Sequence, residues 1–193
     1  MEGNVFSYGN LKLPRSTAIF NITSSKDCPS AKLGLCNIAS ICYAKKAERL
    51  YPKVLPFRRR QTEFWDSCTE EEFINRLEDP KLLRFSESGD FRHQRDVIKV
   101  SGIAERLKKR FTRVYVYTAR KDLNFDNVSD NLTIVGNEFM VHNAFVVVNK
   151  YHLDEEVQKA LADGKKVWVC PMNCRICNQC TKRNKLWIFA PKH

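Results

Sequence analysis

Short apolar runs and longer amphipathic stretches alternate along the chain. The runs predict buried strands at 17–22, 82–86, 114–118, 132–135, 144–148, 166–169 and 186–189, and several of them are continuously apolar. The stretches repeat apolar residues with a helical period and predict helices at 37–51, 69–77, 98–111 and 153–161. Because strands and helices mostly alternate and several strands are apolar on both faces, we predict an α/β fold with a mostly parallel sheet and flanking helices.

Local signals mark the ends of several of these helices. Pro52 and Pro56 are expected to end the first helix, because proline has no backbone N–H to donate and clashes with the preceding turn. Thr69, with a glutamate three residues later, has the spacing of a capping box. Gly164 follows the last helix and is typical of a C-terminal cap.

Four cysteines fall within eleven residues near the end of the chain, at Cys170, Cys174, Cys177 and Cys180. Thiolates this close in sequence can converge on one polynuclear centre while loop amides bond to its sulfides. A single zinc ion usually takes two cysteine pairs separated by a longer loop, and this segment has no such loop. The spacing therefore favours a 4Fe–4S cluster, with structural zinc as the alternative.

A second, looser group of cysteines follows the first predicted strand. Cys28, Cys36 and Cys42 are separated by seven and five residues. The positive end of the helix after this loop would stabilise an anionic cluster. Cys68 is a candidate fourth ligand, and the alternative is that it is a small buried apolar residue. Eight thiols could form two clusters of four or mix between the groups, and the sequence leaves that partition open.

The turn after the second predicted strand is acidic. Ligands of parallel sheets gather at the carboxyl ends of the strands. We therefore take Glu87 and Asp90 as candidate cofactor-binding residues, against the alternative that they cap the next helix. Tyr115 and Tyr117 alternate on one strand face, where they could shield a cluster or relay electrons, or serve as ordinary sheet residues.

The chain has 33 Lys and Arg residues against 22 Asp and Glu, a formal charge of +11. A basic surface attracts polyanions, so nucleic acid is a candidate partner through the clusters 58–60 and 108–110. The alternatives are a solvated basic face, or a positive field that offsets anionic thiolate clusters.

The first residues lack the basic head and apolar core of a signal peptide, and no stretch approaches the roughly 18 apolar residues of a spanning helix. We expect a protein that is not secreted, has no membrane partner and works in a reducing compartment. Disulfides are disfavoured there, which leaves metal ligation as the first explanation for eight cysteines.

Several motifs together resemble the phage "gene product 88"-like family. They lie at 6–14, 17–22, 28–29, 36, 42–44, 87–91, 116–118, 170–180 and 188–189. The resemblance implies a viral origin, in the host cytoplasm or the virion, and a radical-SAM-like partial barrel that holds iron–sulfur centres. It implies no known reaction.

Radical-SAM enzymes carry three cysteines in the loop after the first strand, spaced by three and two residues. In this chain that spacing occurs instead at Cys170, Cys174 and Cys177, far from the first strand. The acidic turn at 87–90 lies roughly where that superfamily binds the methionyl amine of S-adenosylmethionine.

We therefore expect a single iron–sulfur α/β domain over residues 1–193, with a cysteine-rich C-terminal segment at 165–193. The expected function is that of a viral protein with one or two 4Fe–4S clusters, acting in electron transfer or thiol/disulfide chemistry with an unknown redox partner. One alternative is a divergent radical-SAM-like enzyme. Another is a zinc-stapled nucleic-acid-binding protein.

Overall fold

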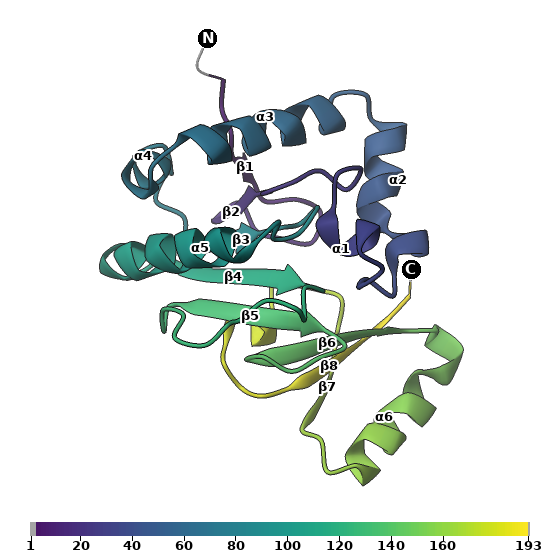
Figure 1. Cartoon of the computed structure of the whole chain (residues 1–193). Coiled ribbons are helices and arrows are strands. Elements are labelled where there is room, and N and C mark those ends of the chain that lie inside the picture. Colours follow the sequence, from purple (N-terminus) through teal and green to yellow (C-terminus); the bar gives the residue numbers. More distant parts are fainter. Residues whose placement is uncertain (1–2, 193) are drawn as a thin grey trace.

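The computed structural model describes residues 3–192, in which an open, twisted sheet carries helices against it (Figure 1). The described strands number eight and follow the order β1-β2-β3-β4-β5-β6-β8-β7. They are β1 (Ser7–Tyr8), β2 (Thr17–Phe20), β3 (Leu82–Phe85), β4 (Arg113–Thr118), β5 (Leu132–Asn137), β6 (Asn143–Val148), β7 (Val167–Val169) and β8 (Trp187–Pro191). Among the described pairs, β1 with β2 is antiparallel and the others are parallel. The prediction of an α/β fold with a mostly parallel sheet is confirmed.

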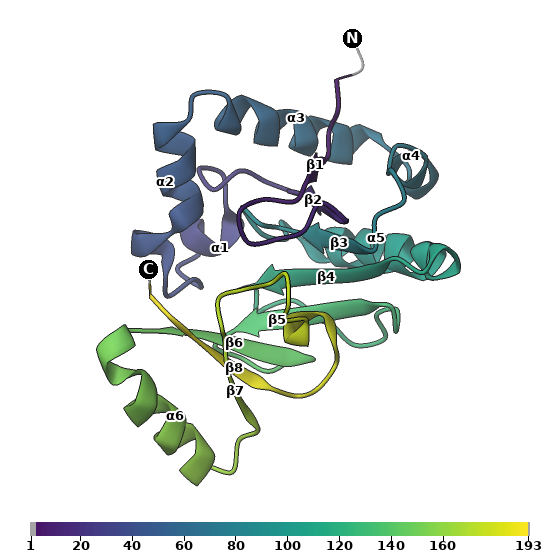
Figure 2. The ribbon, with the colours of Figure 1, turned by 180° about the vertical axis from the view of Figure 1, so that it is seen from behind.

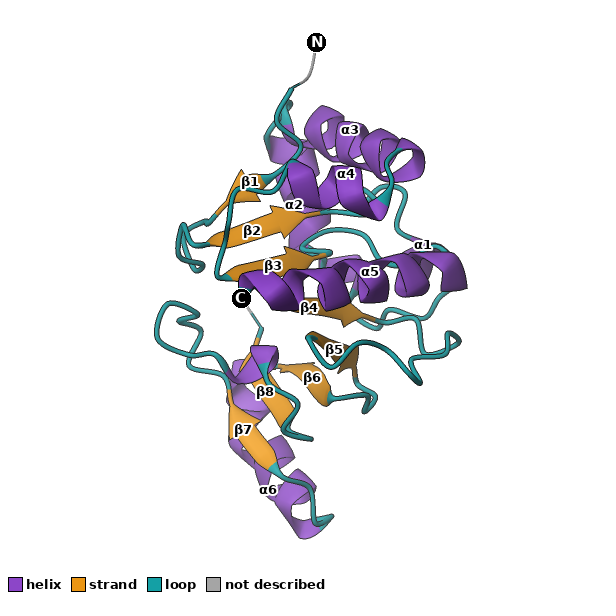
Figure 3. Cartoon of the chain, turned by 90° about the vertical axis from the view of Figure 1, so that its left-hand side faces the viewer, coloured by secondary structure: helices purple, strands orange, loops and turns teal. Residues whose placement is uncertain are grey.

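Helices α3 (Val54–Ser67), α4 (Glu70–Asn75) and α5 (Gln94–Leu107) cover one face of the sheet (Figures 1 and 3). Side chains along a strand point alternately to its two faces, so every second residue of β2 to β5 meets these helices. The buried residues on this face are Ala18, Phe20, Leu83, Phe85, Val114, Val116, Leu132 and Ile134. Their burial fixes the register of the strands and hence the position of the loops that follow them.

An aromatic cluster forms the centre of this core. The ring of Phe73, on α4, has its centroid 4.9 Å from that of Phe20 and 5.6 Å from that of Phe85. Trp65, on α3, packs edge-on against Phe73 at 5.7 Å. Aromatic pairs of this kind add about 0.5–1.5 kcal/mol each to the burial of their area. The cluster therefore holds β2 and β3 side by side, so that their carboxyl ends open at the same edge.

A separate helix, α6 (Leu153–Ala162), covers the same face beside β7 and β8 (Figure 1). It follows the short helix η3 (Lys150–His152), and its Ala160 packs in a small cluster with Val148 and Phe189.

None of the helices in the described part of the chain combines the length and apolarity that a bilayer crossing requires.

The opposite face of the sheet carries segments from both ends of the chain (Figures 2 and 3). The turn after β1 lies there, and so does the connection from β7 to β8, which contains the short helix η4 (Gln179–Thr181). At the carboxyl ends of the strands lie α1 (Pro29–Lys32), the short helix η1 (Ala39–Ile41) and α2 (Tyr43–Leu50).

The sequence did not predict β1, α1 or α3, and several predicted helices have other bounds in the structure. The helix predicted at 37–51 is confined to α2 and η1, because Cys42 adopts an extended backbone between them. Pro56 does not end a helix but lies in the first turn of α3, where the missing N–H costs nothing. The helix predicted at 98–111 starts earlier, at Gln94, and a short helix η2 (Lys108–Arg110) follows it. The capping box at Thr69 is confirmed.

Candidate metal centre

The N-terminal cysteines lie on the loop that follows β2. Cys28 is the residue before α1, and Cys42 is the residue before α2. Cys36 lies between the two helices, where its backbone N–H donates to the carbonyl of Ser30. All three thiols are partly buried. The loop thus gathers these cysteines at the carboxyl edge of the sheet.

Asp90 fastens this loop to two neighbouring strands. It is buried, and its Oδ2 accepts hydrogen bonds from the hydroxyl of Ser30 and, at 2.8 Å, from the backbone N–H of Ala119. Ser30 is two residues beyond Cys28, and Ala119 follows β4. Burial raises the pKa of Asp90, against the lowering effect of the hydrogen bonds from Ser30 and Thr118. Asp90 therefore positions the loop of Cys28 through protein contacts of its own.

Glu48 fastens the same loop to α2 and α3. Its carboxylate is 2.8 Å from the guanidinium of Arg58, and both side chains are only 6% exposed. The backbone N–H groups of Ser25 and Lys26 donate to the two carboxylate oxygens at 2.7 and 3.0 Å. Burial disfavours the charged form, but the hydrogen bonds from Arg58 and Ser25 outweigh it and lower the pKa of Glu48. The helix that begins after Cys42 is thereby held against the residues that precede Cys28.

The thiols of this group influence one another electrostatically. Burial raises the pKa of Cys28 to about 11, and the charges of Asp90 and Cys36 add to the effect. Burial also raises the pKa of Cys36, with the charges of Cys42 and Asp90 acting in the same direction. Since charge effects of this kind fall with distance, they indicate that the loop brings the three thiols into one neighbourhood.

The C-terminal cysteine segment, Cys170 to Cys180, is attached to the sheet at both ends. At its start, the backbone N–H of Cys170 donates to the carbonyl of Phe189 on β8 at 2.7 Å. At its end, Thr133 on β5 donates to the carbonyl of Thr181 at 3.1 Å, and Asn143 on β6 donates to that of Lys182 at 2.6 Å. The segment between these anchors lies on the sheet face opposite α5 (Figure 3).

Within this segment, Cys180 lies against Tyr117 of β4. Burial raises the pKa of Cys180 to about 12, and the charges of Cys170, Cys174 and Cys177 act in the same direction. The hydroxyl of Tyr117 donates a hydrogen bond to the Cys180 thiol, which opposes the shift. The four thiols are therefore close enough for their charges to interact, on an anchored loop.

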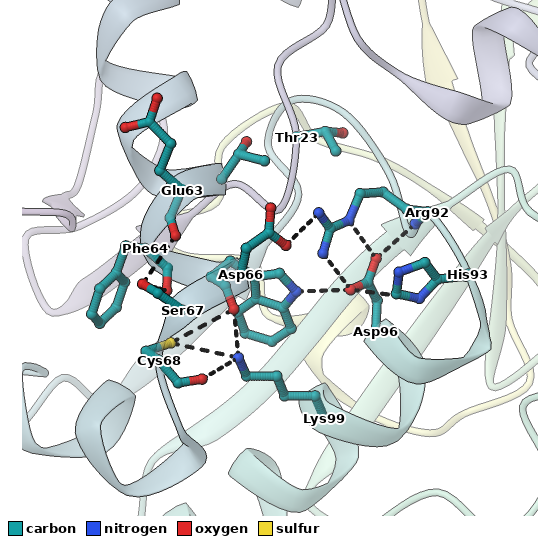
Figure 4. Close-up of polar contacts among 12 residues, drawn as sticks. Thr23, Glu63, Phe64, Asp66, Ser67, Cys68, Arg92, His93, Asp96 and Lys99 are labelled. Atoms are coloured by element: carbon teal, nitrogen blue, oxygen red, sulfur yellow. Dashed lines mark hydrogen bonds and ion pairs between the residues drawn. The ribbon is translucent and has the colours of Figure 1, made fainter.

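The structure does not bring Cys68 together with the other cysteines. It follows α3 in the helix-covered core, and the ammonium of Lys99 lies 3.5 Å from its sulfur (Figure 4). The same ammonium donates to the carbonyls of Trp65 and Cys68 at 2.6 Å. Burial raises the pKa of Cys68, against the lowering charge of Lys99. Its surroundings are those of a packed core residue.

The donor set of the two cysteine groups is one of soft thiols. In residues 3–192, no group of three or more His, Cys, Asp or Glu side chains stands so that it could hold a metal ion, and all eight cysteines are free thiols. Thiolates select zinc, copper(I) and iron–sulfur centres over hard cations such as Mg²⁺. The chemistry of the donors therefore fits an iron–sulfur cluster and also fits zinc.

Glu87 lies beside the N-terminal group on the same edge of the sheet. Asn10 donates to its Oε1 at 2.6 Å, and Tyr43, the first residue of α2, donates to its carbonyl at 2.6 Å. A guanidinium nitrogen of Arg84 lies 3.9 Å from that Oε1. Unlike the buried Asp90, Glu87 therefore borders the sheet face that carries the turn after β1.

The comparisons with known proteins rest on a family model. The model described as "Gene product 88" matches residues 4–147. The chain belongs to the gene product 88 family. No curated protein and no solved structure matches it. The matched range of this gene product 88 protein includes Cys28, Cys36, Cys42 and Cys68, and it ends before the C-terminal cysteine segment.

Sequence reasoning missed three residues that shape the site of this gene product 88 protein. Glu48 and Ser30 secure the N-terminal loop, and no sequence pattern distinguishes them from surface residues. Arg84 lies on the same sheet face as Tyr115 and Tyr117, with its guanidinium 5.2 Å from the Tyr117 ring. A signal for Arg84 existed, since an arginine inside the apolar strand 82–85 is unusual for a buried position.

Proposed function

We propose that this gene product 88 protein binds a 4Fe–4S cluster through Cys170, Cys174, Cys177 and Cys180 and works as a redox protein in the host cytoplasm or the virion. The observation that carries the proposal is the way these four thiols are presented. They lie on one short segment that is anchored to the sheet at both ends, and burial raises the pKa of Cys180 with the charges of the other three thiols acting in the same direction. Thiolates presented in this way can surround one polynuclear centre.

The second part of the proposal concerns the N-terminal group. Cys28, Cys36 and Cys42 would supply three ligands to a second cluster, whose remaining iron would be open to a substrate or to a small thiolate. The hydrogen bonds of Asp90 with Ser30 and of Glu48 with Ser25 support this assignment, because they fix the loop on both sides of Cys28. Cys68 stays outside this centre in the proposal, as its contacts with Lys99 belong to the core.

The cluster would carry electrons to or from a redox partner, or exchange electrons with a thiol/disulfide couple. The protein's own contribution would be to bury the cluster and to supply hydrogen bonds to its sulfurs, which set the reduction potential. Tyr117 is the residue best placed for this role, because its hydroxyl already donates to the Cys180 thiol.

Iron and sulfide analysis of cysteine variants tests the proposal. Protein isolated without oxygen should be brown, absorb near 400 nm, and contain about four or about eight irons with matching labile sulfide. The variant C174A should lose about four of those irons, and the matched variant C68A should lose none. Colourless protein with stoichiometric zinc, or equal iron loss from C68A and C174A, would contradict the proposal.

A second candidate is a divergent radical-SAM-like enzyme, with the sheet as its partial barrel. It is favoured by the position of the N-terminal cysteines after β2, the first parallel strand, at the same edge as the turn at 87–90. Anaerobic, reduced protein incubated with S-adenosylmethionine would then release methionine. Absence of both binding and cleavage would remove this candidate and leave the redox protein in place.

A further inference from the structure

Arg84 occupies a position in the sheet where a charged side chain is costly. It lies on β3 between Leu83 and Phe85, which face the aromatic core. Its own side chain therefore points to the opposite face, and in the register of the sheet it stands beside Ile19 and Tyr115. The side chain is only 17% exposed. A guanidinium removed from water to this extent needs an anionic or strongly hydrogen-bonding partner.

The described residues satisfy this guanidinium poorly. Its ion pair with Glu87 is long, at 3.9 Å, where a charge-assisted hydrogen bond would measure about 2.8 Å. Its Nε is buried and has no hydrogen-bond partner. The ring of Tyr117, 5.2 Å away, offers a cation–π contact in place of a hydrogen bond. The aromatic ring thus holds Arg84 in place, and the guanidinium keeps an N–H group that donates to no described residue.

A second unpartnered donor lies on the same face. The amide Nδ2 of Asn137, at the end of β5, is buried without a hydrogen-bond partner. Asn137 is two residues beyond Val135, which pairs with Tyr117, so it shares the face of Tyr117 and Arg84. Among the described residues, this face therefore carries a buried donor without a hydrogen-bond partner at both β3 and β5.

A cleft lies near the edge of this face. It has a volume of about 580 Å³ and lies between the turn after β1 and the C-terminal cysteine segment. Its lining includes Asn10, Arg15 and Arg175. Asn10 donates to the same Glu87 oxygen that Arg84 approaches, which connects the cleft to Arg84. Two further arginines, Arg15 and Arg175, line the cleft and make it attractive to an anion.

We propose that Arg84 is the anchor of a binding site for an oxyanion, the carboxylate or phosphate group of a small-molecule ligand, on the sheet face beside the C-terminal cysteine segment. The planar guanidinium matches two oxygens of such a group, and its free Nε–H supplies one of the two donors. Tyr115 and Tyr117 form the apolar wall of the site, and Asn137 offers a donor to a more distant acceptor of the ligand.

This site does not depend on the proposed cluster, because none of its donors is a thiol. The test uses the full chain, prepared once with iron and once without it. Inorganic phosphate and acetate serve as separate probes, and the ¹⁵N signals of the arginine Nε–H groups report on binding. In wild-type protein, the Arg84 signal should shift with saturation by one or both probes, which also distinguishes phosphate from carboxylate.

Variants then assign the binding. R84Q should weaken the binding of the effective probe at least tenfold, and R84K should weaken it less. The matched variant R106Q, which changes an exposed arginine of α5 on the other face of the sheet, should bind within about twofold of wild type. If R84Q does not fold, the Arg84 signal of the wild-type protein still decides the matter.

Two results would overturn the proposal. In the first, phosphate and acetate shift only the signals of Arg15 and Arg175, which would place the anion in the outer cleft. In the second, the Arg84 signal responds to iron loading and to neither probe, which would make a metal cluster its counterion. Probe binding at Arg84 in protein that never takes up iron would support the proposal and refute the cluster.

Discussion

Replacing Glu48 by glutamine tests whether the loop of Cys28 is held by a buried ion pair. The substitution keeps the shape of the side chain but leaves the charge of Arg58 without its partner at a place where both side chains are 6% exposed. Removing one partner of a buried pair costs about 3–5 kcal/mol. Because glutamine still offers one oxygen to the backbone N–H groups of Ser25 and Lys26, we expect a loss of about 3 kcal/mol, the lower end of that range.

Urea unfolding followed by tryptophan fluorescence measures this loss. At pH 7 the midpoint of E48Q should fall with an unchanged denaturant slope, which indicates a change in stability alone. The matched variant D163N breaks the ion pair of Asp163 with Lys165, whose side chains are 51% and 32% exposed, and it should cost less than about 1 kcal/mol.

The pH dependence adds an independent check. The pKa of Glu48 is lowered in the folded protein, so its stabilisation is fully present above the ordinary carboxyl pKa of about 4.3 and is lost as the pH falls through the lower folded value. The stability difference between wild type and E48Q should thus hold from pH 7 to about pH 5 and shrink below about pH 4. An E48Q variant as stable as D163N, or a difference that does not change with pH, would refute the reasoning.

Three further predictions concern other parts of the fold. F73A should destabilise the protein by about 3–5 kcal/mol in urea unfolding, because Phe73 is fully buried in the aromatic cluster. G89A should destabilise the protein more than G34A does. Both glycines have φ of +69°, but a Cβ at Gly89 would lie 2.3 Å from the carbonyl oxygen of Thr23, whereas a Cβ at Gly34 would meet nothing within 4 Å. His142 should titrate near pH 4 by NMR, because burial and two neighbouring cations lower its pKa to about 4. Acidification from about pH 6.5 to 4 should therefore reduce the stability of the fold, since the unfolded chain takes up a proton on this histidine and the folded protein does not.

Most of the sheet could be predicted from the sequence because most of its strands are short apolar runs. Continuous apolar runs such as 114–118 and 132–135 became β4 and β5 with ends shifted by two residues or fewer. Helix α3 was missed because Pro56 was taken as a terminator, although proline is accepted in a first turn. Strand β1 has two residues, and its pairing with β2 depends on a long-range contact that no local pattern encodes.

The candidate site was predictable in part. The cysteine spacing singled out the C-terminal segment, whose role as a cluster ligand stays a prediction. The turn after β3 was correctly placed at a strand end. The sequence did not separate the roles of its two acids. Asp90 is buried and accepts hydrogen bonds from Ser30 and Ala119, whereas Glu87 borders the sheet face that carries the turn after β1. This difference arises from contacts between segments that are distant in sequence. For the same reason, the position of Cys68 beside Lys99 could not be read from a count of cysteines.

Mössbauer spectroscopy of protein produced with ⁵⁷Fe and kept from oxygen tests the iron–sulfur proposal most directly. We predict the quadrupole doublets of 4Fe–4S clusters, accounting for nearly all the iron, and a loss of one cluster's share of that signal when Cys177 is replaced by alanine. Folded protein that shows no bound iron, or iron whose spectrum is unchanged in C177A, would contradict the assignment of a cluster to the C-terminal cysteine segment.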